Sequence, residues 1–237
     1  MDGEHADRVI LWDIDGTLVE IGPTGASIFD VAVERVLGRH PGPHGVRMSG
    51  KTDPQIALEI LVGSGLAEAE ANEHLPEVVR HLESELAALE AEVRARGRVL
   101  PGVVDVLTAL ASEPSVHQSL VTGNLRANAA VKLDAFDLLP LVDLETGAYG
   151  SDDADRLRLV PIALGRADRL RGVDVDRART WVVGDTPRDL ACAREGGVRC
   201  LLVATGGTSR EELAACAPDA LLDDLTDTAG VVAILRS

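Results

Sequence analysis

Two aspartates at alternate positions, Asp13 and Asp15, follow an apolar run over residues 9–12 and lead directly into Gly16. Side chains alternate along a strand, so the two carboxylates share a face while the backbone stays extended. Gly16 then permits a sharp turn. Carboxylates this close repel each other unless a cation lies between them or one holds a proton. The pair therefore predicts a metal site or an acid–base pair, although Asp-Gly by itself is also a common turn signal.

Two further strand-like runs, residues 117–121 and 180–183, also end in polar residues. Their apolar patterns are typical of strands, and the second suits the centre of a sheet. The residues that follow carry hydroxyl, amide or carboxylate groups: Thr122, Gly123 and Asn124 after the first run, Asp185 and Asp189 after the second. Because open α/β sheets bind ligands at the carboxyl ends of their strands, we expect these groups to lie near the aspartate pair.

Together, these segments resemble the haloacid dehalogenase-like superfamily of phosphohydrolases, whose motifs are similar to DxDGTL, T/S-G-N, a lone base and GDxxxD. Three of the four motifs match in order between Asp13 and Asp189. The alternation of strands and helices extends the resemblance over nearly the whole chain. The resemblance implies a Mg²⁺-dependent phosphomonoester hydrolase that acts on a small phosphorylated metabolite through an aspartyl-phosphate intermediate.

The resemblance also implies a role for each motif residue. Asp13 looks like the nucleophile and Asp15 like the general acid and base. An aspartate at the second position argues against the halide-releasing members, which lack it. Thr122 is expected to donate its hydroxyl to a phosphoryl oxygen, and Gly123 and Asn124 to bind substrate through their amides, although all three also suit an ordinary helix start.

A magnesium site is expected from a carboxylate oxygen of Asp13, the backbone carbonyl of Asp15, and Asp185. Asp189 is assigned to the same site, either as a ligand or through water. Its alternative role is that of an acidic residue in the first turn of a helix, where the helix dipole favours negative charge.

The third motif departs from the family, which usually supplies a lysine between the second and fourth motifs. Lys132 is the last lysine in the chain, and only arginines follow. Arg156 and Arg158 lie at the start of the helix expected before the strand at residues 180–183. We predict that Arg156 is the catalytic cation of this motif, because a polar loop precedes it and an arginine can clamp phosphoryl oxygens. A solvated arginine-rich helix face is the alternative.

Composition limits the class of protein. The 237 residues are 46% hydrophobic but only 2% aromatic, so the core must consist of aliphatic side chains, as in parallel sheets. The formal net charge of -16 argues against nucleic acid or an anionic membrane as partner. No apolar stretch approaches the roughly 20 residues that span a bilayer. Three cysteines without paired spacing predict neither a disulfide nor zinc, and suit the cytoplasm.

The expected fold is an α/β Rossmann-like parallel sheet core, residues 1–18 and 99–237, with an inserted small all-helical cap domain, residues 19–98. Helical periodicity over residues 26–37, 54–61 and 66–94, with no strand-like run, supports the insertion. In the core, strands are expected at residues 9–12, 117–121, 141–144, 180–183 and 198–203, with helices between them and a helix, short strand and helix at the end.

The cap segment at residues 48–54 resembles the G-K/R-T-D-P loop of phosphoglycolate phosphatase-like members. Lys51 is predicted to bind substrate, with a solvated loop lysine as the alternative. Asp53 or Thr52 is expected to cap the helix that begins at Pro54, and for Asp53 a capping role is preferred to substrate binding. The resemblance leaves two rival functions open: a sugar phosphomutase of the same fold, and a non-catalytic protein that binds phosphometabolites. The sequence makes no prediction of oligomeric state.

Overall fold

A five-stranded parallel sheet forms the centre of the computed structural model, which describes residues 8–237. Its strand order is β4-β1-β5-β6-β7, with all neighbouring pairs parallel. The strands are β1 Arg8–Trp12, β4 Val116–Leu120, β5 Trp181–Gly184, β6 Arg199–Val203 and β7 Ala220–Leu222. This arrangement confirms the predicted Rossmann-like α/β fold. The three strands that precede the polar motifs, β4, β1 and β5, are direct neighbours, so their carboxyl ends meet.

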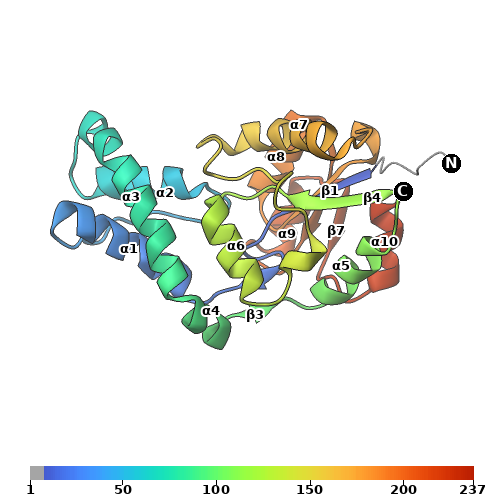
Figure 1. The fold of residues 1–237 in the computed structure, drawn as a ribbon, viewed down its shortest axis with the longest axis horizontal. Helices are drawn as coiled ribbons and strands as arrows, with labels where there is room; N and C mark the ends of the chain where they lie inside the picture. Colours follow the sequence, from blue (N-terminus) through green and yellow to red (C-terminus); the bar gives the residue numbers. More distant parts are fainter. Residues whose placement is uncertain (1–7) are drawn as a thin grey trace.

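Helices cover both faces of the sheet because its strands are apolar on both sides (Figure 1). In β1, Ile10 and Trp12 pack in one core cluster, whereas Val9 and Leu11 pack in the other. Helices α5 and α10 contribute to the first cluster, and α7 and α8 to the second. The helices of this part are α5 Val103–Ala111, α6 Arg126–Asp134, α7 Leu159–Arg171, α8 Pro187–Gly196, α9 Arg210–Ala215 and α10 Thr228–Leu235.

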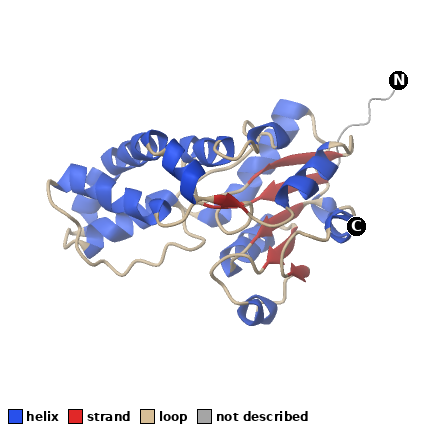
Figure 2. Cartoon of the chain, turned by 90° about the horizontal axis from the view of Figure 1, so that it is seen from below, coloured by secondary structure: helices blue, strands red, loops and turns tan. Residues whose placement is uncertain are grey.

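The segment over residues 21–97 is mainly helical and lies beside the sheet (Figures 1 and 2). It contains α1 Thr24–Leu37, α2 Asp53–Gly63, α3 Glu68–Ala88 and α4 Glu90–Arg96. In α1, the buried residues Ile28, Phe29, Ala32 and Val33 recur at helical spacing and form the face that packs inward. The helix ends at Gly38, whose φ of 66° suits a left-handed cap.

A short strand pair connects this helical segment to the sheet. The strands β2 Val19–Glu20 and β3 Arg98–Val99 pair antiparallel. The expectation that no strand intervenes between residue 18 and about residue 98 was therefore wrong at the two ends of this span. Two extended residues are too few to show an alternating pattern, and the pair forms because the outgoing and returning chains run side by side. The domain boundaries remain a prediction.

The strand expected at residues 141–144 is absent from the described part of the chain. A 3₁₀ turn, Leu139–Leu141, occupies its start. The chain then follows the outer edge of β4, where the amide of Asp143 donates to the carbonyl of Gln118 at 2.8 Å and that of Ala148 to Leu120 at 2.9 Å. Five residues thus span two residues of β4, so the segment bulges and only an isolated bridge forms at Ala148.

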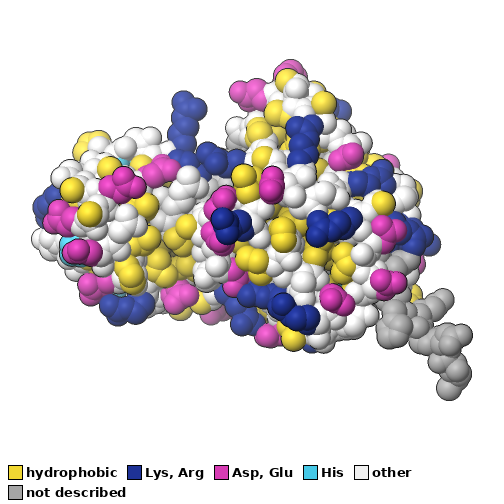
Figure 3. Space-filling model, turned by 90° about the horizontal axis from the view of Figure 1, so that it is seen from above, with side chains coloured by type: hydrophobic (Ala, Val, Ile, Leu, Met, Phe, Trp, Pro, Cys, Tyr) yellow, Lys and Arg dark blue, Asp and Glu magenta, His cyan; other side chains and the backbone are white. Residues whose placement is uncertain are grey.

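Across residues 8–237, no helix combines the length and apolar character needed to cross a membrane. Figure 3 shows basic side chains interspersed with acidic ones on one face of the molecule.

Candidate active site

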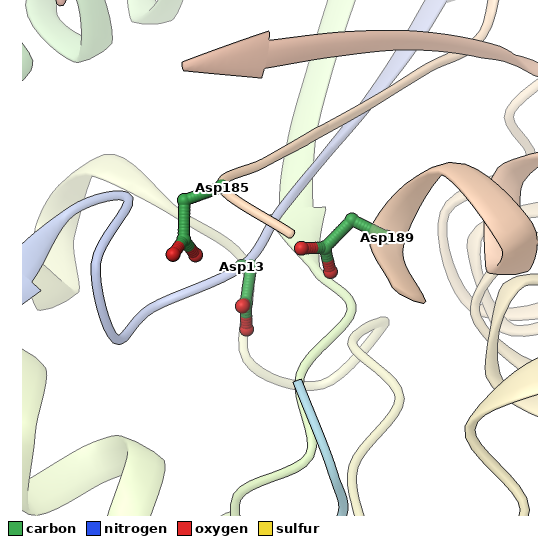
Figure 4. A group of neighbouring side chains, drawn as sticks. All are labelled: Asp13, Asp185 and Asp189. Carbon is green, nitrogen blue, oxygen red and sulfur yellow. The ribbon is translucent and has the colours of Figure 1, made fainter. Parts of the chain in front are cut away.

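Three buried carboxylates meet at the carboxyl ends of β1 and β5 (Figure 4). Asp13 directly follows β1, and its backbone amide donates to the carbonyl of Val183 at 2.9 Å, which ties it to β5. Asp185 follows β5, and Asp189 lies in the first turn of α8. Oxygen atoms of the three carboxylates all lie within 4.8 Å of one another. The structure thus brings together three of the residues assigned to the metal site.

Burial raises the pKa of Asp13 to about 6, against the opposing effect of the Arg156 guanidinium. Burial also raises the pKa of Asp185 to about 8, and the negative charges of Asp189 and Asp13 add to this effect. Three carboxylates therefore share a low-dielectric volume with one arginine. Carboxylate oxygens are the ligands that Mg²⁺ prefers, so both the donor set and the excess negative charge fit a divalent cation.

Arg156 extends from a 3₁₀ turn, Arg156–Arg158, into this carboxylate group. Its Nη2 lies 3.1 Å from Oδ2 of Asp13 and also contacts Oδ1 of Asp189. Burial disfavours the guanidinium charge, but Asp13 and Asp189 outweigh it and raise the pKa of Arg156. Arg158 points away, with 71% of its side chain exposed. Of the two candidates for the third motif, only Arg156 reaches Asp13.

Asp189 also has the helix-terminal contacts that were its alternative interpretation. Its Oδ2 accepts hydrogen bonds from the amide of Thr186 at 3.0 Å and the hydroxyl of Thr186 at 2.7 Å. Together with the bond from the Asp189 amide to the Thr186 hydroxyl, these contacts form a capping box at the start of α8. Since Asp189 is fully buried, the cap also fixes the carboxylate against Arg156.

The Asp15 carboxylate turns away from the three buried carboxylates. Lys132 in α6 donates to its two oxygens at 2.8 and 2.6 Å, and Asn124 Nδ2 donates at 2.8 Å. Gly16 permits this turn with a φ of 80°, and a Cβ there would lie 2.6 Å from Oδ2 of Asp185. Asp13 thus contacts Arg156 among the buried carboxylates, whereas Asp15 pairs with Lys132. The metal ligand predicted from Asp15 is its backbone carbonyl, which is independent of this side-chain direction.

The loop formed by Thr122, Gly123 and Asn124 connects β4 to α6. Thr122 Oγ1 accepts hydrogen bonds from the amide of Asn124 at 3.3 Å and its Nδ2 at 2.8 Å. Because these bonds use oxygen lone pairs, the hydroxyl hydrogen can still be donated to an anion. The nine-residue helix α6 begins directly after the loop, with its amino end toward the same volume.

Asp53 has a different partner from the one expected. Thr52, not Asp53, caps α2, since its hydroxyl accepts from the Gln55 amide at 3.3 Å. Asp53 Oδ2 instead accepts from the amide of Leu125 at 2.9 Å, at the start of α6. Its own amide donates to the carbonyl of Gly123 at 2.8 Å. The helical segment is therefore bonded to the loop that precedes α6.

A cavity of about 620 Å³ opens onto this constellation. All of the predicted catalytic and substrate-binding residues line it: Asp13, Asp15, Lys51, Thr122, Gly123, Asn124 and Arg156. Asp185 also lines the cavity, whereas the fully buried Asp189 lies behind it. Lys51 forms an ion pair with Glu59, so its ammonium group already has a partner.

Known proteins resemble the chain over nearly its full length. It is 30% identical over 222 residues to a plasmid-encoded phosphoglycolate phosphatase of Cupriavidus necator, which covers 91% of this chain and 89% of that protein. It is also 30% identical over 230 residues to a phosphoglycolate phosphatase of Pseudomonas fluorescens, covering 92% of this chain and 77% of that protein. The chain belongs to the haloacid dehalogenase-like superfamily of hydrolases.

Two other comparisons agree with this family. A HAD-hydrolase-like family model matches residues 160–228. A Bacteroides fragilis protein solved as a haloacid dehalogenase-like hydrolase superposes with a TM-score of 0.67 at 20% identity, covering 92% of this chain and 98% of that one, and shares the fold. The haloacid dehalogenase-like chain is a phosphatase of the phosphoglycolate phosphatase-like type.

Sequence analysis of this phosphatase did not assign Lys132 to the site. Lys132 was considered only as the last lysine before the third motif. In the structure it lies on the cavity wall and also donates to Asn124 Oδ1 at 2.6 Å. A signal was present, because Lys132 shares a helix face with the buried residues Asn128, Ala129 and Leu133. A lysine on the buried face of a helix that follows a phosphate-binding motif suggests an internal anionic partner.

Proposed function

We propose that this phosphatase is a cytoplasmic, Mg²⁺-dependent phosphomonoester hydrolase that forms an aspartyl-phosphate on Asp13. The observation that carries the proposal is the contact of Arg156 with Asp13 inside a group of three buried carboxylates that borders a cavity. The phosphoglycolate phosphatases among its relatives support a small phosphorylated metabolite as the substrate class, with phosphoglycolate as the reference compound.

The carboxylates of Asp13, Asp185 and Asp189, with the Asp15 carbonyl, would hold the metal. Bound Mg²⁺ would neutralise the charge of the phosphoryl group and align it for attack. Asp185 is held beside Asp13 because the Thr17 hydroxyl donates to its Oδ1 at 3.3 Å. Arg156 orients the Asp13 carboxylate and offers its remaining donors to the phosphoryl oxygens.

Asp13 attacks phosphorus through one carboxylate oxygen while the P–O bond to the leaving alcohol breaks. Thr122 donates its hydroxyl to a phosphoryl oxygen, and the amides of Gly123 and Asn124 face the same group. An incoming phosphoryl dianion competes with Asp15 for Lys132, which allows Asp15 to carry the proton that it gives to the leaving oxygen. Asp15 then accepts a proton from the water that hydrolyses the acyl phosphate.

The test is phosphate release from a panel of small phosphate esters, phosphoglycolate included, in Mg²⁺ and in EDTA. We expect metal-dependent release that is lost in Asp13→Asn. Asp13→Ala should retain less than about a tenth of wild-type turnover, given the usual loss when a nucleophile is removed. Higher residual activity would refute the aspartyl-phosphate route. Product isomers formed with a bisphosphate activator would identify a mutase instead, and ligand binding without turnover would identify a binding protein.

A further inference from the structure

The lining of the cavity includes an apolar wall in addition to the aspartates. Its side chains come from the helical segment and from β2, and several are almost completely buried. The apolar residues of this wall are Val19, Ile21, Ala26, Phe29, Met48 and Ile56. Phe29 is one of only two phenylalanines in the chain. The part of a substrate that extends away from the phosphoryl group therefore meets aliphatic and aromatic carbon.

The cations on the cavity surface are already neutralised. Each lysine and arginine that lines the cavity in the described part of the chain forms an ion pair with an acidic side chain. The pairs are Lys51 with Glu59, Arg98 with Glu20, Lys132 with Asp15, and Arg156 with Asp13. Among these cations, Lys51 is the residue predicted to bind substrate. It lines the cavity, and only 12% of its side chain is exposed.

These two features disfavour a second anionic group on the substrate. A carboxylate in the outer cavity would either lose its hydration beside apolar side chains or break an existing ion pair. An uncharged hydrocarbon group has no such cost, and it gains roughly 25 cal/mol for each Å² of apolar surface that it buries. The cavity volume of about 620 Å³ leaves room for such a group next to the phosphoryl site.

We propose that the preferred substrate is a phosphomonoester whose organic part is uncharged and largely apolar, and that Glu59 sets this preference by neutralising Lys51. The inference rests on the proposed phosphatase function and adds its substrate class. Glu59 does not line the cavity that holds the aspartates. It acts through Lys51 and is therefore a specificity-determining residue that does not contact substrate.

The test compares phenyl phosphate with 4-carboxyphenyl phosphate by measuring phosphate release in Mg²⁺. The carboxyl group makes the phenolate of the second compound the better leaving group, so intrinsic reactivity opposes the expected order. We expect kcat/KM for phenyl phosphate to exceed that for 4-carboxyphenyl phosphate by about tenfold or more, the scale of discrimination when a charged group lacks a partner. Phosphoglycolate should also be the poorer substrate. If 4-carboxyphenyl phosphate and phosphoglycolate were hydrolysed as well as phenyl phosphate or better, the inference would be overturned and the phosphatase function would remain intact.

Glu59→Gln tests the role of Glu59 directly. Because this change frees the Lys51 ammonium, kcat/KM for 4-carboxyphenyl phosphate should rise by about tenfold while that for phenyl phosphate stays unchanged. Glu70→Gln, an exposed position on α3, removes the same charge and should alter neither value. Unchanged discrimination in Glu59→Gln would overturn the role of Glu59. Phosphate release from none of the three esters would overturn the proposed phosphatase function and this substrate class with it.

Discussion

Arg156 Nη2 lies 3.1 Å from Asp13 Oδ2 and contacts Asp189 with the same nitrogen. A single guanidinium thus links the proposed nucleophile to a residue that caps α8. Asp13 follows β1 and Asp189 lies at the start of α8, and the arginine holds the two carboxylates together. This arrangement supplies a cation where the family's motif usually has a lysine.

Arg156→Ala should lower kcat by about 100-fold or more, because it removes the cation that orients Asp13 and faces the phosphoryl group. Arg158→Ala is the matched control, since that side chain is 71% exposed and pairs with Asp153 and Asp155. Steady-state kinetics with the best ester of the panel will measure both. Similar small losses in the two variants would refute the assignment of the third motif to Arg156.

Lys132→Met should lower kcat by about 100-fold, because Asp15 loses the ammonium group that holds its two oxygens. This is the lower end of the usual contribution of a general acid–base residue. Inorganic phosphate should also inhibit this variant more weakly. Arg126→Met in the same helix is the control, since its side chain is 49% exposed and pairs with Glu145. If both variants kept wild-type kcat, Lys132 would have no part in catalysis.

The stability of the metal-free protein should depend on pH through the buried carboxylates. Burial raises the pKa of Asp185 from its ordinary value of 3.8 to about 8. A carboxyl group whose pKa is higher in the folded chain binds a proton more tightly there. The stability that it contributes is therefore lost as pH rises from about 4 to about 8. In EDTA, we expect the wild-type Tm to fall over this range relative to that of Asp185→Asn.

Magnesium should reverse this trend because it binds the ionised carboxylates. The increase in Tm caused by Mg²⁺ should be larger at pH 8.5 than at pH 6, where the metal must displace a proton. A concentration 100 times Kd stabilises the folded state by about 2.7 kcal/mol. Asp185→Asn should show little of this shift, whereas Asp105→Asn, an exposed first-turn residue of α5, should show all of it. An equal Mg²⁺ shift at both pH values would contradict the proposed ligand set.

Asp53→Ala should reduce the free energy of unfolding by about 1–2 kcal/mol, because the Leu125 amide loses its carboxylate acceptor at the start of α6. Asp53→Asn retains an oxygen acceptor of the same size and should lose less. Burial raises the pKa of Asp53 from 3.8 to about 6, so wild type loses stability as pH rises from about 4 to about 6, and the Asn variant should gain stability relative to it over that range. Denaturant unfolding at pH 5 and pH 8 will test this order, with Asp105→Ala as the control. Equal losses in both Asp53 variants would show that the acceptor is not what matters.

The places of Asp13 and Asp185 could be predicted from the sequence, whereas the pairing of Asp15 with Lys132 could not. Asp13 and Asp185 each follow an apolar run long enough for one buried strand, and parallel strands deliver the residues after them to a common edge. The choice of Arg156 over Arg158 also had a local basis, because the polar loop before Arg156 starts a tight turn in which Asp155 accepts from the Leu157 amide at 3.1 Å. The strand expected at residues 141–144 failed because a local apolar pattern cannot show whether an edge has room for a regular ladder.

Contacts between distant segments were decided only by the tertiary structure. Lys132 and Asp15 are 117 positions apart, and Asp53 and Leu125 are 72 apart. Their meeting depends on the rotation of α6 about its own axis and on where the helical segment lies beside the sheet. Packing of buried side chains such as Ala129 and Leu133 sets the first, and the β2–β3 pair helps to set the second. Local periodicity specifies which face of a helix is buried, whereas the partner of a charged group on that face depends on how the elements pack together.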